Sequence, residues 1–280
     1  GLLQFHRYAD GARTSFEEHL VEGVKYACAD RHVRLHFTVS PEHRALFKAL
    51  AEKCAPRFVQ NEGVQLDITF SEQKPSTDTV AANPDGTPFR NADGSLLFRP
   101  GGHGALIENL NDLDADVVFV KTVDNVCPDR LKADTVTYKQ VLAGLLVSLQ
   151  ARAFAYLEEL EAGDVSEERL HEMLQFVEKD LHCHSDAAEA LEGLELLDYL
   201  YCRLNRPMRV CGMVRNVGEP GGGPFLAYNP DGSVSLQILE SSQIDMNDPS
   251  KKALFEQGTH FNPVDLVCGL RDFNGSEEDE

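Results

Sequence analysis

Two stretches of the sequence combine residue types that could bind a phosphorylated ligand. Residues 100–104 read Pro-Gly-Gly-His-Gly, and Asp124 and Asn125 follow the apolar run 117–123. Glycines let backbone N–H groups approach a ligand closely, because they lack a Cβ and tolerate positive φ. A carboxylate at the end of a strand suits Mg²⁺, which takes hard oxygen ligands and also coordinates substrate phosphates. Together the two stretches predict a phosphate site with Asp124 at its centre.

Each candidate residue also has a purely structural interpretation. An Asp after a strand is often a turn or cap residue, and His103 could cap the helix that follows the glycines. Glu240 could be an ordinary turn residue, and Asn262 precedes a proline, which is a turn signal. The residue types alone leave both interpretations open.

The surrounding pattern alternates strands with helices, which predicts a mixed α/β fold. The run 117–123 is too uniformly apolar for a half-exposed strand. We therefore expect it to be buried on both faces of a mostly parallel sheet flanked by helices. Asp124 would then lie at the carboxyl edge of the sheet, where open α/β sheets bind their ligands. The other strands predicted for this sheet are 33–39, 64–70 and 208–216, and the predicted helices are 14–29, 41–54 and 105–113.

The pattern becomes helical after Asp124 and returns to strands near residue 208. We expect the helical part to pack beside the sheet as an insertion. Turn signals of the type Asn-x-Asp-Gly interrupt the strand regions, and they predict hairpins or long loops. The predicted helices are 135–162, 166–182 and 185–203, and the turn signals lie at 83–86, 91–94 and 229–232.

The composition is that of a soluble globular protein. The 280 residues include 26% charged and 42% hydrophobic residues, and the net charge is −20. Such a charge argues against nucleic acid or an anionic membrane as a partner, because both would be repelled. It does not argue against a small phosphorylated substrate, since one Mg²⁺ and a few local Lys or Arg reverse the field inside a cleft. No apolar run approaches the length that we expect of a membrane span, and no signal peptide is recognisable.

The seven cysteines are scattered and odd in number. This usage is typical of reduced thiols and predicts a cytoplasmic protein. The run His182-Cys183-His184, with Cys202 further on, could be a zinc site or a polar helix end. Zinc ligands usually come as C-x₂₋₄-C or H-x₃₋₅-H pairs, so the spacing favours the helix end.

Taken together, these motifs resemble the uridylyltransferase superfamily, the sugar-1-phosphate nucleotidyltransferases. Residues 100–104 look like the P-x-G-H-G or G-N-G loop of that superfamily, and residues 119–125 look like its strand ending in Asp-Asn. Residues 237–241 are similar to its V-V-E-Y sugar-binding strand, and residues 259–262 take the place of its N-A-G-N segment. More closely, the whole chain is similar to a bacterial family known only as a domain of unknown function.

The superfamily resemblance implies a Rossmann-like fold of the nucleotide-diphospho-sugar transferase type. The implied reaction transfers a nucleotidyl group, such as uridylyl from UTP, to a sugar 1-phosphate with Mg²⁺ as the cofactor. It also implies a site in which Asp124 is the catalytic and metal-binding residue, with Asp265 a candidate for a second ligand. The implied nucleotide-binding residues are Gln73, Gly102, His103 and Gly104, and the implied sugar-binding residues are Asn125, Gly212, Glu240 and Asn262.

The same resemblance predicts a domain organisation. Residues 1–134 would form the nucleotide-binding half, 135–205 the helical insertion, and 206–280 the sugar-binding half. The phosphate-binding loop of the superfamily, with its Arg and the Lys after it, has no counterpart in the sequence. We therefore expect a piece of a larger domain that binds weakly and turns over little. The alternative is a non-catalytic nucleotide- or sugar-binding protein of the same fold. The oligomeric state is not predicted.

Overall fold

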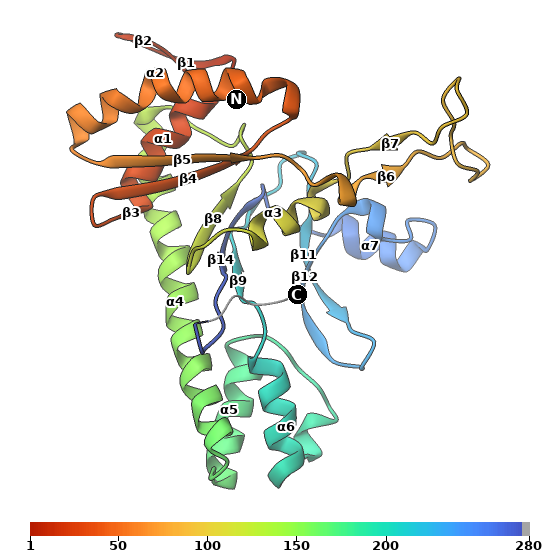
Figure 1. The fold of residues 1–280 in the computed structure, drawn as a ribbon. Helices are drawn as coiled ribbons and strands as arrows, with labels where there is room; N and C mark the ends of the chain where they lie inside the picture. The colour runs from red at the N-terminus through yellow and green to blue at the C-terminus, as the bar shows by residue number, and fades with distance from the viewer. Residues whose placement is uncertain (276–280) are drawn as a thin grey trace. The chain divides into compact units, whose positions relative to one another are not determined.

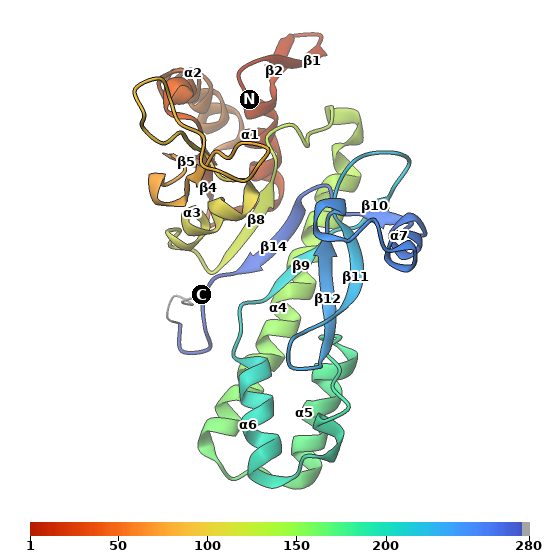
Figure 2. The same cartoon turned by 90° about the vertical axis from the view of Figure 1, so that its right-hand side faces the viewer.

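The computed structural model describes residues 1–275, which fall into two compact units (Figures 1 and 2). Unit 1 comprises Gly1–Asp114 and Val126–Val136. Unit 2 comprises Ala115–Asn125 and the chain from Thr137 onward. The longest helix, α4, therefore begins in unit 1 and continues through unit 2.

The α-helices of the described residues are α1 (Ser15–Tyr26), α2 (Arg44–Glu62), α3 (Ile107–Asn111), α4 (Lys132–Ala162), α5 (Glu167–Lys179), α6 (Gly193–Leu204) and α7 (Pro249–Glu256). The strands are β1 (Gln4–Tyr8), β2 (Gly11–Thr14), β3 (Cys28–Ala29), β4 (His32–Thr38), β5 (Gln65–Ser71), β6 (Thr79–Val80), β7 (Phe98–Arg99), β8 (Val117–Lys121), β9 (Arg209–Cys211), β10 (Val214–Arg215), β11 (Gly223–Tyr228), β12 (Val234–Leu239), β13 (His260–Phe261) and β14 (Asp265–Gly269). The short 3₁₀ helices include η3 (His103–Leu106), η5 (Ala188–Ala190) and η6 (Ser241–Gln243).

The core of unit 1 forms where α1 and α2 pack on the β4–β5 pair (Figure 1). A capping box starts α1, because Thr14 Oγ1 accepts from the Glu17 N–H at 3.2 Å and the Glu17 carboxylate accepts from the Thr14 N–H at 2.8 Å. Phe16, at the start of α1, is fully buried and contacts aromatic rings of β4, α2 and β5. These contacts fix both helices on one face of the strands.

The prediction of one mostly parallel sheet is not confirmed. Strands β4 and β5 are parallel, as predicted, but every other strand pair in the described residues is antiparallel. The predicted strand partners also separate, since β4 and β5 form one sheet with β3 in the order β3-β4-β5, whereas β8 and β9 both pair with β14. The fold is a mixed α/β arrangement of several small sheets.

The sheet of unit 2 has the order β8-β14-β9, and the central strand comes from the end of the chain. Helix α4 lies against it: a Cβ placed on Gly269 of β14 would meet the Gln150 side chain at 2.4 Å. Hairpin β11–β12 forms around the predicted turn at 229–232, where Gly232 has φ +80°. Residues 80–98, predicted to be a hairpin or a long loop, are bounded by the antiparallel pair β6 and β7.

The predicted helical segment is present as α4, α5 and α6, which lie side by side in unit 2 (Figures 1 and 2). Their shared core contains fully buried side chains from each helix, among them Leu157, Met173 and Leu196. The last of these helices starts at Gly193, later than predicted, because the preceding residues form a loop and η5.

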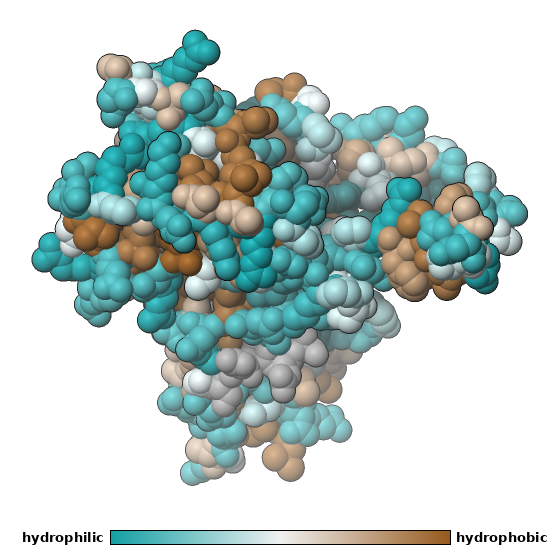
Figure 3. All heavy atoms as spheres, turned by 45° about the horizontal axis from the view of Figure 1, so that its top comes forward, coloured by the Kyte–Doolittle hydropathy of each residue, from teal (hydrophilic) through white to brown (hydrophobic). Residues whose placement is uncertain are grey.

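Helix α4 also corrects one expectation from the sequence. The segment Asp129–Ala162 is long and apolar enough to span a membrane by length and composition, and 22% of its most apolar window is buried. A core helix of a soluble protein passes the same test, so this finding is weak evidence for a membrane span. The face of the molecule in Figure 3 is mostly hydrophilic and is interrupted by smaller hydrophobic areas. A soluble protein is compatible with these features.

Candidate functional site

Several predicted residues meet at one edge of the sheet in unit 2. Strands β8 and β9 both run antiparallel to β14, so their carboxyl ends lie at the same edge. Asp124 and Asn125 follow β8 at this edge, and Gly212 follows β9. Strand β14 begins at the same edge with Asp265, which pairs with the last residue of β8. Segments far apart in the sequence therefore converge here.

The side chain of Asn262 holds this edge together. It is 6% exposed, and its amide nitrogen donates to the carbonyls of Gly212 at 2.6 Å and Asp265 at 3.1 Å. Its amide oxygen accepts from the Val264 N–H at 2.9 Å. Asn125 reaches the same loop, since its amide nitrogen donates to the Pro263 carbonyl at 3.2 Å. Both N–H groups of the Asn262 side chain thus donate to backbone carbonyls, and one of these bonds positions Gly212.

Glu240 lies beside this loop through Gly222. The Gly222 carbonyl accepts from the Asn262 N–H at 2.8 Å, and a Cβ on Gly222 would lie 2.4 Å from the Ile238 side chain and 3.7 Å from Glu240 Cγ. Only glycine fits at this position. Glu240 itself is exposed and precedes η6, where its N–H donates to the Gln243 side chain at 2.9 Å. Asn125, Gly212 and Asn262 are therefore linked through one loop of unit 2, and Glu240 lies beside Gly222, which pairs with Asn262.

Two carboxylates at this edge differ in their surroundings. Asp124 is exposed in the turn after β8. Asp265 is 23% exposed and forms an ion pair with Lys139 of α4, whose side chain is 1% exposed. Mg²⁺ usually takes one or two carboxylates and completes its shell with water and substrate phosphates. Asp124 can supply one such ligand, whereas Asp265 is already neutralised. Asp124 and Asp265 therefore do not form an all-protein cage for a metal ion.

The predicted nucleotide-binding residues lie together in unit 1. The Gln73 side-chain amide has one orientation in which its oxygen and its nitrogen both form hydrogen bonds. In that orientation the oxygen accepts from the Gly101 N–H at 2.8 Å and the nitrogen donates to the Gly101 carbonyl at 3.2 Å. Gln73 therefore braces the glycine loop. Gly102, His103 and Gly104 are exposed, and a Cβ on either glycine would meet open space. The backbone of this loop is accessible to a ligand.

The helix predicted at 105–113 is shorter than expected. The structure has the 3₁₀ turn η3 followed by the five-residue helix α3. A helix of this length has a small dipole, so the argument for anion binding at its N-terminus is weakened. Because Gln73 and the glycine loop belong to unit 1 and Asp124 to unit 2, the phosphate site predicted from both stretches stays a prediction.

Unit 1 also contains a buried polar cluster that the sequence interpretation missed. The carboxylate of Glu18 is fully buried and pairs with Lys132, which is 2% exposed. Glu18 also accepts a hydrogen bond from Tyr8 at 2.6 Å and lies 3.0 Å from His6 Nδ1. A cavity of about 350 Å³ adjoins the cluster and is lined in part by Arg13 and Lys132. In the sequence Glu18 was only an acidic residue in the first turn of a helix.

The partners of Glu18 set the protonation of the cluster. Burial works to raise the pKa of Glu18, but the hydrogen bonds from its three partners outweigh it, so its pKa lies below the usual range. Burial and the hydrogen bond to Glu18 raise the pKa of Tyr8 to about 12. Glu18 is therefore a carboxylate and Tyr8 a phenol at neutral pH.

Comparison with known families gives one match. The sequence model of a family described as "Domain of unknown function (DUF4301)" matches residues 1–279. No curated protein matches. The comparison therefore supports the predicted resemblance to a domain-of-unknown-function family and gives no support to the resemblance to nucleotidyltransferases.

Proposed function

Because the chain belongs to the DUF4301 family, whose description assigns no activity, we propose a function from its own residues. The proposed function is a nucleotidyltransferase-like one, in which the edge of unit 2 binds a sugar phosphate with Mg²⁺ and a nucleotidyl group is transferred from a nucleoside triphosphate. Gln73, Gly102, His103 and Gly104 of unit 1 stay the predicted nucleotide-binding residues.

The observation that carries the proposal is the convergence at the carboxyl ends of β8 and β9. Asp124, Asn125, Gly212 and Asn262 come from three separate segments and lie at one edge. Open α/β sheets bind ligands outside the carboxyl ends of their parallel strands, and β8 and β9 run in the same direction. The position of these residues therefore supports a ligand site at this edge.

The charges at the edge suit a phosphorylated ligand. A Mg²⁺ held by Asp124 would neutralise phosphate oxygens. The ion pair between Lys139 and Asp265 leaves the buried lysine neutralised, so Asp124 supplies the exposed negative charge of this edge. Asn262 keeps the loop rigid, because each of its amide hydrogen bonds fixes a backbone group.

The transfer reaction needs few reactive side chains. An oxygen of the sugar phosphate attacks the α-phosphate of the nucleoside triphosphate in line with the leaving pyrophosphate. Catalysis then consists of orienting both phosphates and neutralising their charge. Asp124 would contribute charge and position, and the Gly212 loop would orient the sugar. Because the reaction requires no nucleophilic side chain, the side chains at this edge are compatible with it.

Asp124→Asn tests the proposal, because it keeps the side-chain volume and removes only the charge. We expect Mg²⁺-dependent binding of UTP or hexose 1-phosphates, measured by calorimetry, to weaken by about tenfold or more. Since Asp124 is exposed, the stability should change by no more than about 0.5 kcal/mol. Asp164→Asn, at an exposed loop position of unit 2, is the matched control.

The outcomes separate the two functional classes. Mg²⁺-dependent release of pyrophosphate from UTP and a hexose 1-phosphate supports the transferase. Binding of the same ligands without pyrophosphate release supports the non-catalytic binding protein. Unchanged ligand affinity in the Asp124→Asn variant would contradict both assignments of the edge.

A further inference from the structure

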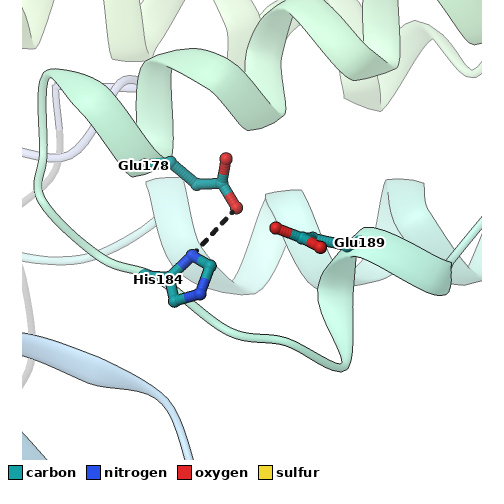
Figure 4. A group of neighbouring side chains, drawn as sticks. All are labelled: Glu178, His184 and Glu189. Carbon is teal, nitrogen blue, oxygen red and sulfur yellow. Dashed lines mark ion pairs between the residues drawn. The ribbon is translucent and has the colours of Figure 1, made fainter.

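A cluster of metal-ligating side chains lies outside the sites described above. Glu178 is near the end of α5, His184 is in the loop that follows, and Glu189 is in η5. One nitrogen of the His184 ring and one oxygen from each carboxylate all lie within 4.8 Å of one another. Figure 4 shows the two carboxylates pointing toward each other across the space beside the ring. Unit 2 contains all three residues.

The backbone holds His184 firmly in this position. The chain reverses after α5 through His182, which has φ +52°. His184 then pairs with Val234 of β12, with its N–H donating at 2.9 Å and its carbonyl accepting at 2.8 Å. The loop carrying the ring is therefore anchored to a strand on one side and to α5 on the other.

The hydrogen bonding of the ring directs its free nitrogen toward Glu178. His184 Nε2 lies 2.9 Å from the Asp186 carboxylate, which favours a proton on that nitrogen. Nδ1 then presents its lone pair to Glu178 Oε1 at 3.4 Å. A carboxylate on the far nitrogen of a ligating histidine is the usual support of a metal site.

Apart from its ion-pair distance to His184 Nδ1, the Oε1 atom of Glu178 is poorly satisfied. It is buried from solvent and forms no hydrogen bond with any residue of the described part of the chain. Burying an unsatisfied carboxylate oxygen is unfavourable. A positive charge between Oε1 and Nδ1 would satisfy both atoms.

The distance between these two atoms leaves room for a metal ion. A proton shared in an N–H···O hydrogen bond brings N and O to about 2.7–3.2 Å, which is shorter than the observed 3.4 Å. A tetrahedral ion with ligands at about 2.0–2.2 Å separates neighbouring ligand atoms by about 3.4 Å. The observed spacing is therefore compatible with a shared metal ion.

We propose that Glu178, His184 and Glu189 bind a divalent transition-metal ion of the Zn²⁺ type. One imidazole and two carboxylates suit such ions. His184 and Glu189 are exposed, so a fourth position would be open to water. The site shares only His184 with the cysteine-containing set considered from the sequence, and Cys183 packs against the helical core instead. The ion would tie the loop after α5 to the helix.

The test is a titration of the full chain with Zn²⁺ by calorimetry, with the melting temperature as a second readout. We expect Zn²⁺ to raise the melting temperature, because an ion bound only by the folded state stabilises it. Glu178→Gln, His184→Ala and Glu189→Gln should each weaken binding by about tenfold or more. Asp186→Asn should weaken it by about 10–100-fold by releasing the ring.

His171→Ala is the matched control, since His171 is exposed on α5 and contacts only the helix backbone in the interactions described. Its Zn²⁺ affinity should equal that of the unmodified chain. The seven thiols are a rival site for the ion. Zinc binding that persists in His184→Ala and disappears on thiol alkylation would overturn the proposal.

The protonated histidine is the second rival. The hydrogen bond to Asp186 raises the pKa of His184, and an imidazolium ring would also attract Glu178. If Zn²⁺ does not bind, and His184→Ala and Glu178→Gln lower the melting temperature equally, the cluster is an ion pair and the metal site is wrong.

Discussion

Glu18→Gln is expected to destabilise unit 1 by about 3–5 kcal/mol, which is the cost of removing one partner from a buried ion pair. The substitution keeps the shape of the side chain but replaces the buried carboxylate partner of Lys132, which is 2% exposed, with a neutral amide. Asp129, which is 3.2 Å from the Lys132 ammonium group and partly exposed, is then its remaining acidic partner. Tyr8 and His6 lose the same charged partner. Urea denaturation of the full chain measures the loss.

Two further variants show whether burial causes this effect. Glu52→Gln replaces an exposed glutamate of α2 and should change the stability by no more than about 0.5 kcal/mol. The double variant Glu18→Gln with Lys132→Met removes both charges and should be more stable than Glu18→Gln alone. A loss below about 1 kcal/mol in Glu18→Gln would show that water reaches the pair.

The pH dependence of stability gives a second readout of the same prediction. The pKa of Glu18 is lowered in the folded chain, so its contribution is complete above the ordinary value of 4.5 and is lost as the pH falls through the folded-state pKa. The pKa of Tyr8 is raised from 10.0 to about 12, so its contribution is lost as the pH rises through that range. Glu18→Gln should flatten the acid side of this profile.

The local elements of the fold could be predicted because their signals lie within a few residues. The capping box of Thr14 and Glu17 starts α1, and Asn229 to Gly232 turns the hairpin β11–β12. Helix α2 shows the limit of this reasoning. It continues to Glu62, beyond the predicted end near residue 54, although Pro56 lies within it. Burial of Phe58 in the core supports the added turns.

The pairing of strands could not be predicted, because an apolar run does not identify its partner. The run 117–123 predicted a strand in a parallel sheet, and β8 is indeed a strand there. Its neighbour is β14, an antiparallel strand from the other end of the sequence. All five residues of β8 are partly exposed, whereas a strand covered on both faces would be buried. Only the long-range contact decides this arrangement.

In the candidate site, too, local patterns could be predicted from the sequence, whereas contacts between distant segments could not. The rule that ligands bind at strand ends placed Asp124 at the carboxyl end of its strand, and it follows β8 there. Gly212 was implied only by the family resemblance and lay inside the predicted strand 208–216, whereas β9 ends at Cys211, just before it. The lysines Lys132 and Lys139 were missed, because a lysine in a helix is usually solvated. Each is buried here and forms an ion pair with a carboxylate from a distant segment. A helical pattern contains no information on such a partner.

Asp265→Asn is expected to destabilise unit 2 by about 3–5 kcal/mol, and more than Lys139→Met does. The reason is the unequal burial of the pair. Lys139 is 1% exposed, so it remains charged and desolvated when its carboxylate is removed. Asp265 is 23% exposed and can be hydrated when the lysine is removed. Urea denaturation of both variants measures the difference.

The double variant Lys139→Met with Asp265→Asn completes the thermodynamic cycle. Since it removes both charges of the pair, it should be more stable than Asp265→Asn alone, and the coupling between the two sites should favour the native pair. Equal losses in the two single variants would mean that both charges reach water. A larger loss in Lys139→Met would mean that the lysine side chain stabilises unit 2 mainly by packing, for example beside the Phe119 ring 5.9 Å from its ammonium group. In either case the ion pair would not be what holds α4 to the edge where Asp265 begins β14.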